Sequence, residues 1–233
     1  MVDTSAEETD PELEGRLKAI DPGVIYLNPG KNLGYFGGAR YGKEWLDREG
    51  TGFDALIVSN VDLTFETAGM AEIIRSYGDG ETGVLAPAIL EDGKDINPYK
   101  LERMNRKQQR RRILYLRCPA LQKPVDMIRK IRKKQIQENR EYPDGMKIYM
   151  GYGACMIFLE KYFASGCDLN LPLFLYGEEP YVSEMCLRHG LSIRYAPKIR
   201  ILNIGHVSMG SIPSRTMRKY MIESAKYCIR EFY

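Results

Sequence analysis

The 233-residue chain lacks an apolar run long enough to cross a bilayer, which needs about 20 residues. Its longest nearly unbroken apolar stretch covers only residues 154–159. The opening MVDTSAEETD is acidic and lacks the apolar segment of a signal peptide. The five cysteines form no CxxC pair, which disfavours a disulfide framework or a zinc site. Together these absences predict a soluble, cytoplasmic protein with reduced, mostly buried thiols.

Charge is abundant but unevenly placed. Residues 103–134 contain thirteen Lys or Arg and a single acid, a net charge of +12, so the rest of a chain of net charge +3 carries −9. This contrast favours a local anionic partner over a general affinity for nucleic acid. An apolar content of 44% is enough for a real core, so we predict one domain over 1–233 with a basic, partly amphipathic helical insertion at 103–140.

Apolar segments of strand length alternate with helix patterns, which predicts an α/β fold. The expected helices cover 11–20, 41–48, 68–77 and the segment from Pro180 to just before Gly190. The expected strands cover 24–27, 55–58, 83–86, 191–195 and 199–204. The run at 55–58 is typical of a strand buried on both faces of a parallel sheet, and the glycine-rich segment 28–42 is typical of a turn. We therefore expect a mixed, mostly parallel sheet flanked by helices.

Polar side chains follow several of these strands, where ligands of open α/β sheets bind. They are Asn60 with Asp62, Glu178 with Glu179, and His206. Each also has a structural interpretation. Asn and Asp commonly form turns, paired glutamates are favourable at a helix start, and a single histidine after a strand is often structural.

Six segments, in chain order, resemble the family 2 glycosyltransferases. They are NLGYFGGARYG, ALIVSNVDLTF, YGACMIF, FLYGEEPYVSEMCLRHGLSIRYAP, ILNIGHVSMGS and RKYMIESAKYCIREFY, the last resembling the rhamnosyltransferase-like branch. The resemblance implies a nucleotide-diphospho-sugar transferase fold of the GT-A type. It also implies transfer of a sugar, with inversion, from a nucleoside-diphosphate donor to a saccharide or lipid-linked saccharide.

The resemblance assigns a role to each polar group. Asp62 and His206 would hold Mg²⁺ or Mn²⁺ against the donor diphosphate, since hard divalent cations prefer such ligands with phosphate oxygens. Asn60, where the family often has an acid, would contact the sugar or ribose. Glu179 would be the general base, kept ionised by its place at a helix start. Glu178 would orient the donor sugar or the acceptor.

The same resemblance places the nucleotide in the N-terminal part of the chain. Asn32, Gly34, Gly37, Gly38 and Arg40 belong to the glycine-rich segment, whose backbone would approach the nucleotide closely. A surface turn is the alternative for these glycines. Asp3 aligns with the base-reading acid of the family. Because Val2 and Asp3 directly follow the first methionine, we expect the chain to lack the family's first strand.

The basic segment admits three interpretations. Residues 121–138 place apolar side chains on one helical stripe among Lys and Arg, which fits an anionic membrane surface at the inner face of the cell membrane. A lid packing its stripe on the domain fits as well. Nucleic-acid binding through RKQQRRR is disfavoured by the scarcity of stacking aromatics. For the whole chain, the alternatives to a transferase are an inactive relative acting as a scaffold and a basic nucleic-acid-binding protein.

Overall fold

The computed structural model describes residues 1–4, 12–118, 141–204 and 214–233. The chain divides into two units. The first comprises Met1–Phe53 and Leu169–Leu175, and the second comprises Asp54–Asp168 and Tyr176–Tyr233. Each unit is described by itself.

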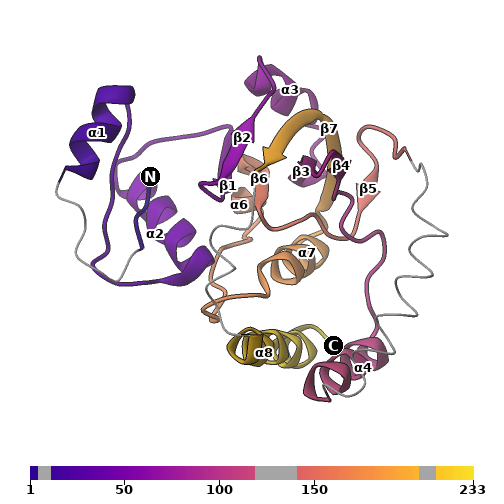
Figure 1. The fold of residues 1–233 in the computed structure, drawn as a ribbon. Coiled ribbons are helices and arrows are strands. Elements are labelled where there is room, and N and C mark those ends of the chain that lie inside the picture. The colour runs from indigo at the N-terminus through magenta and orange to yellow at the C-terminus, as the bar shows by residue number, and fades with distance from the viewer. Residues whose placement is uncertain (5–11, 119–140, 205–213) are drawn as a thin grey trace. The chain divides into compact units, whose positions relative to one another are not determined.

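The first unit contains the helices α1 (Leu13–Ile20) and α2 (Gly34–Arg48), shown in Figure 1. The prediction of a helix ending at residue 20 is confirmed. The prediction of a turn up to residue 42 is wrong, because α2 begins at Gly34. The side-chain oxygen of Asn32 accepts a hydrogen bond of 2.9 Å from the Gly34 N–H and so satisfies a donor at the helix start. The expected strand at 24–27 is reduced to a single parallel bridge between Val2 and Leu27.

The glycines of α2 are required by close packing within this unit. A Cβ atom on Gly34 would lie 2.0 Å from the carbonyl oxygen of Phe174, and Gly34 also has a φ of +71°. A Cβ on Gly38, one turn later, would lie 3.0 Å from Cγ2 of Thr4. Residue types with a side chain would force these segments apart, so the glycine pattern has a structural cause in the packing of α2.

The second unit is built on a seven-stranded sheet. Its strands are β1 (Ala55–Ser59), β2 (Leu63–Phe65), β3 (Thr82–Glu91), β4 (Lys94–Asp95), β5 (Lys147–Ile148), β6 (Cys155–Leu159) and β7 (Ser192–Asn203). The strand order is β1-β6-β3-β7-β2, with β4 paired to β3 and β5 paired to β7. Among the described strands only β3 and β7 are parallel neighbours, and the other pairings are antiparallel.

The sheet is therefore mixed, as expected, but mostly antiparallel rather than mostly parallel. Alternation of strands and helices along the chain does not determine which strands become neighbours. Here β1 pairs with β6, about a hundred residues later, with Ala55 opposite Leu159. β1 lies at one end of the strand order and is therefore an edge strand, and Val58 is its only buried residue. The expectation of a strand buried within a parallel sheet is therefore also wrong.

The central strands are longer than the sequence suggested. β3 is buried from Thr82 to Ile89 and continues through Pro87, where a strand end was expected. β7 is one strand where two were expected. An irregularity in their pairing, between Pro87 and Ala88, accommodates the missing N–H of Pro87 and the Pro197 of β7. Both prolines therefore interrupt the pairing register without ending a strand.

Helices cover both faces of this sheet (Figure 1). They are α3 (Met70–Ser76), α4 (Arg106–Arg117), α6 (Glu160–Ala164), α7 (Glu178–Arg188) and α8 (Ser214–Phe232). Ile74 and Tyr77 at α3 pack with Leu85 and Ile89 of β3 in the main core cluster. α7 packs between the sheet and α8, and α4 lies against α8. Of the helices in the described part of the chain, none has both the length and the apolar character of a membrane span.

An ion pair between a buried carboxylate and a partly exposed arginine connects α7 to its neighbours. Glu184 of α7 is 2% exposed and accepts two hydrogen bonds of 2.7 Å from the guanidinium of Arg103. The hydroxyl of Tyr149 donates a third, at 2.8 Å. Arg103 also donates to the carbonyl oxygen of Phe232 at the end of α8. One carboxylate thus joins α7, the segment before α4 and the C-terminal helix.

Arg103→Met should destabilise the protein by about 2–3 kcal/mol, because it leaves the buried Glu184 carboxylate without its cation. Loss of one partner of a fully buried pair costs about 3–5 kcal/mol, and the partly exposed Arg103 lowers that figure. Urea denaturation measures the difference.

The matched control is Arg200→Met. The ion pair between Arg200 and Glu66 is exposed and should contribute less than about 1 kcal/mol to the free energy of unfolding. Adding Glu184→Gln to Arg103→Met should restore part of the lost stability. Equal effects of the two single substitutions would show that the Glu184 pair is not an anchor.

Candidate active site

Two segments run side by side where β1 ends and β6 begins. Ser59 is opposite Cys155, and the N–H of Asn60 donates a hydrogen bond of 2.9 Å to the carbonyl oxygen of Ala154. β1, β3 and β7 all run in the same direction, because β6 is antiparallel to both β1 and β3. Their carboxyl ends therefore share one edge of the sheet, which is where α/β proteins bind ligands.

Asp62 lies at this edge, in the turn between β1 and β2. Its neighbour Leu63 pairs with Asn203, the last residue of β7. Asn203 lies within 3.4 Å of a carboxylate oxygen of Glu91, the last residue of β3. The Oδ1 atom of Asp62 is buried and has no hydrogen-bond partner among the described residues. Such an atom is costly to bury unless a donor or a cation satisfies it.

Glu179 reaches the same edge from the start of α7. A Cβ atom on Gly153 would lie 2.7 Å from its Oε1, so only glycine leaves room for this carboxylate. The N–H of Gly153 also donates to it. Glu179 therefore contacts residue 153, while Asn60 bonds to residue 154. Asn60 and Glu179 thus flank residues 153–154, and the charges of Glu179 and Asp62 both act on the preceding residue, Tyr152.

The backbone before α7 holds the two glutamates in place. Tyr176 and Gly177 have φ angles of 63° and 112°, in the left-handed region that favours glycine. α7 then begins at Glu178, which confirms the helix predicted around Pro180. Glu178 is 6% exposed, and its carboxylate accepts from the N–H groups of Tyr176 and Glu178 itself.

Burial changes the ionisation of both glutamates. It raises the pKa of Glu178 to about 7, and repulsion from Glu179 adds to the shift. Burial also raises the pKa of Glu179, against the opposing effects of backbone N–H groups and of the cations Arg112 and Lys100. The helix start was expected to keep Glu179 ionised, and desolvation, the largest cause of its pKa shift, acts in the opposite direction.

Further residues around Glu179 were missed by sequence reasoning. The rings of Tyr99 and Tyr152 lie 5.6 Å apart, and Tyr99 is 45% exposed. Burial raises the pKa of Tyr152, and the charges of Glu179 and Asp62 add to the shift. Asn97 orients this segment, since its side-chain oxygen accepts a hydrogen bond of 2.8 Å from the Tyr152 N–H.

Two cations, Lys100 and Arg112, also act on Glu179. Lys100 pairs through its backbone with Met150 and points its ammonium group toward the sulfur of Met104, at 3.6 Å. Burial, followed by repulsion from Arg112, lowers the pKa of Lys100 to about 8. Arg112 lies on α4, in the basic segment, for which the sequence patterns predicted no role beside Glu179. Nothing in the sequence distinguishes Lys100, whereas Tyr152 stands in the quoted YGACMIF.

The remaining predicted site residues belong to the first unit or fall outside the described residues. His206 and the stripe at 121–138 fall outside the described residues. Asp3, Asn32, Gly34, Gly37, Gly38 and Arg40 belong to the first unit. There the Asp3 carboxylate accepts a hydrogen bond from the Tyr26 hydroxyl, and Arg40 forms an exposed ion pair with Glu44 at 3.6 Å. The described ranges contain no group of three or more His, Cys, Asp or Glu arranged to hold a metal ion.

No protein-family model matches the chain, and no curated protein matches its sequence. Solved structures do match its fold. A crystal structure of GalNAc-T7 with UDP, GalNAc and Mn²⁺ superimposes with a TM-score of 0.55 at 12% sequence identity, covering 93% of this chain. The fold resembles that of a GT-A glycosyltransferase. This chain spans 40% of the GalNAc-T7 chain, and at this identity the likeness shows the fold alone.

Glu178→Gln should change how stability depends on pH. A carboxyl group with a raised folded-state pKa contributes stability that is fully present below its unfolded pKa, near 4.5, and is lost as pH rises through about 7. Gln does not ionise. The stability of the Glu178→Gln variant relative to the parent should therefore increase by about 2–3 kcal/mol between pH 5 and pH 8.

Chemical denaturation of both proteins at the two pH values measures this. Glu160→Gln, at the exposed start of α6, is the control and should differ from the parent equally at both. The assignment fails if Glu178→Gln behaves like that control.

Proposed function

We propose that the chain is a glycosyltransferase that moves a sugar from a nucleoside-diphosphate donor to a saccharide or lipid-linked saccharide, with inversion. The observation that carries this proposal is a pair of carboxylates, one just after β1 and one at the start of α7. The first is Asp62, which has a buried and unpartnered oxygen and lies two residues after Asn60, which bonds to Ala154. The second is Glu179, which contacts Gly153. The GT-A-like fold supports the assignment, and the sequence motifs favour a family 2 enzyme of the rhamnosyltransferase-like branch.

On the donor side, Asp62 would hold Mg²⁺ or Mn²⁺, and His206, which follows β7 in the sequence, would complete the site. The metal would supply positive charge to the departing diphosphate. The buried Oδ1 of Asp62 fits this role, because a hard cation is the partner that such an oxygen lacks. Asn60 would contact the sugar or ribose. The residues that would bind the nucleotide are Asp3, Asn32, Gly34, Gly37, Gly38 and Arg40.

On the acceptor side, Glu179 would accept the proton of the attacking hydroxyl. The hydroxyl oxygen forms a bond to the anomeric carbon while the bond from that carbon to the diphosphate breaks. The nucleoside diphosphate leaves with the electron pair, and the configuration inverts. A raised pKa makes Glu179 a stronger base than a solvated carboxylate.

Neighbouring groups would position the sugars. Tyr99 and Tyr152 form a partly exposed aromatic surface beside Glu179, suited to the apolar face of a sugar ring. Glu178 has a pKa of about 7, so at neutral pH its protonated form can donate a hydrogen bond to a sugar oxygen. One glutamate would thus act as the base and its neighbour as the orienting group.

Asp62→Asn should weaken binding of nucleotide sugars in the presence of Mn²⁺ while leaving the fold intact, since the amide keeps the shape but loses the charge. The measurement is the rise in melting temperature on adding a panel of nucleotide sugars with and without Mn²⁺. Asp54→Asn, at the other end of β1 and exposed, is the control and should keep the parent response. An unchanged Mn²⁺-dependent shift in Asp62→Asn removes Asp62 from the metal site.

Glu179→Gln should lower the transfer rate by about 10²–10⁴-fold, the usual loss when a general base is removed. Donor binding should persist, because the base faces the acceptor. Transfer is measured with the donor that gives the largest thermal shift. Glu178→Gln should lower the rate less, and a reversed order would assign the base to Glu178. A parent protein that binds donor but neither transfers nor hydrolyses it would be an inactive scaffold.

A further inference from the structure

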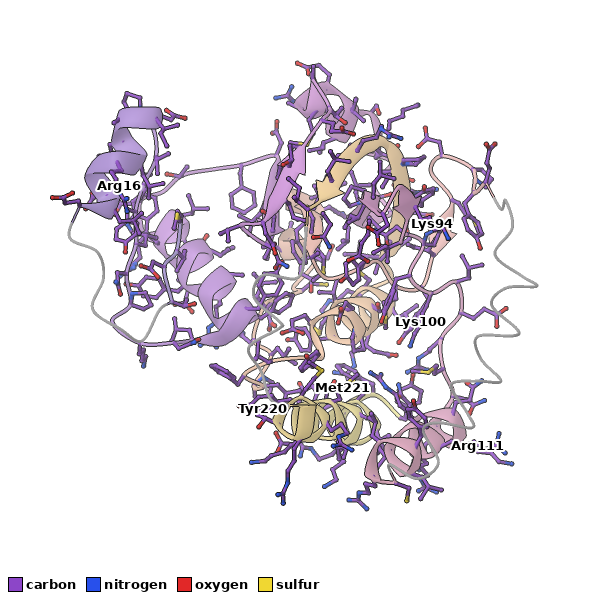
Figure 2. All side chains as sticks on the ribbon, in the orientation of Figure 1. Arg16, Lys94, Lys100, Arg111, Tyr220 and Met221 are labelled. Carbon is purple, nitrogen blue, oxygen red and sulfur yellow. The ribbon has the colours of Figure 1, made fainter. Side chains whose placement is uncertain are left out.

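A basic groove lies between α4 and α8, and its lining does not include the proposed catalytic carboxylates. Its volume is about 440 Å³, and Leu116 and Ile222 give it apolar surface. The charged residues that line it are Arg117, Arg215, Arg218, Lys219, Lys226 and Glu223. Five cations and one acid leave the groove with a net charge of +4. In Figure 2, nitrogen-tipped side chains extend from both helices, near the labelled Arg111, Tyr220 and Met221.

Cations dominate the whole surface of these two helices. α4 has six Lys or Arg and no acid, and α8 has five with two acids. No ion pair between described residues neutralises the six cations of α4. Packing the helices side by side therefore concentrates like charges, which repel each other unless an anion is bound. Such an arrangement is unfavourable for a purely structural surface.

Apolar side chains accompany these cations. Leu116 is buried between the helices, and Leu114, on α4, is 56% exposed. Cationic helices with some exposed leucine bind the boundary of an anionic bilayer, where the charges meet headgroups and the leucine enters the acyl region. Surfaces that bind single-stranded nucleic acid use stacking aromatics instead, and none of the residues lining this groove is aromatic.

We propose that the α4–α8 groove docks the protein on an anionic phospholipid bilayer, with lipid phosphates between the two helices. The inference rests on described residues alone and does not require the basic stripe at 121–138. It also does not require transferase activity. Arg112, on the same helix as Leu116 and one turn earlier, acts on Glu179, so docking would place the proposed acceptor side near the membrane. That position suits a lipid-linked acceptor.

The test compares two triple variants of equal charge. Arg215→Gln, Lys219→Gln and Lys226→Gln remove three exposed groove cations, and Arg48→Gln, Lys94→Gln and Lys161→Gln remove three exposed cations elsewhere. Either variant lowers the net charge from +3 to 0. Binding is measured by co-sedimentation with vesicles of phosphatidylcholine alone or mixed with phosphatidylserine, and melting temperatures confirm that both variants fold.

The parent should bind only the mixed vesicles. The groove variant should lose about 100-fold in affinity, from three cations at about 1 kcal/mol each, and the control should stay within about threefold. Leu114→Ser should weaken vesicle binding but not binding of a single-stranded oligonucleotide. Thermal shifts with nucleotide sugars should be equal in both triple variants, which separates this test from that of the proposed function.

Four results would overturn the proposal. The first is absence of binding to mixed vesicles by the parent. The second is an equal loss in the two triple variants, which would indicate an effect of total charge. The third is tighter binding to the oligonucleotide than to vesicles, lost in the groove variant, which would make the groove a nucleic-acid site. Displacement from vesicles by millimolar inorganic phosphate would also contradict docking on a bilayer and indicate a site for free phosphate.

Discussion

The parallel pairing of β3 with β7 is the constraint on which the second unit depends. These two strands are the longest in the sheet. Because β3 is buried from Thr82 to Ile89, its backbone groups need partners within the protein, and β7 supplies them along one side. β6 and β2 then add antiparallel strands on either side, and β1 follows β6. Two reversals return β1 to the direction of β3. Three strands therefore end at one edge although most pairings are antiparallel, and that edge carries Asp62, Glu91 and Asn203.

Acidic groups at this edge are held at the cost of desolvation. Glu178 and Glu179 are adjacent, both have raised pKa values, and Asp62 has a buried oxygen without a partner. A structure selected only for stability would not gather such groups. The strained backbone at Tyr176 and Gly177 and the absence of a side chain at Gly153 are what allow Glu179 to occupy its position. Local strain of this kind is common at functional sites.

Charge of the opposite sign is concentrated on α4 and α8. The bidentate pair between Arg103 and Glu184 anchors the chain just before α4 and also holds the end of α8 through Phe232. One buried carboxylate thus supports both walls of the basic groove. α4 contributes residues to both sites: the charge of Arg112 opposes the rise that burial causes in the pKa of Glu179, and Leu116 and Arg117 line the groove. The proposed docking of this groove on a bilayer would therefore bring the proposed acceptor side close to the membrane.

Local sequence patterns were enough to predict the α/β class, the helix at GEEP and the polar residues after β1. α3, α7 and the strand at residue 55 form close to their predicted bounds. Strand partners, the continuation of β3 and β7 past their prolines, and the helical state of the glycine-rich segment could be read only from the folded chain. Each of these depends on contacts between distant residues, such as Ala55 with Leu159 or Gly34 with Phe174. The same reason explains why Lys100, Arg112 and the desolvation of the glutamates could not be predicted: a local pattern does not specify which charges and which buried surfaces the fold places together.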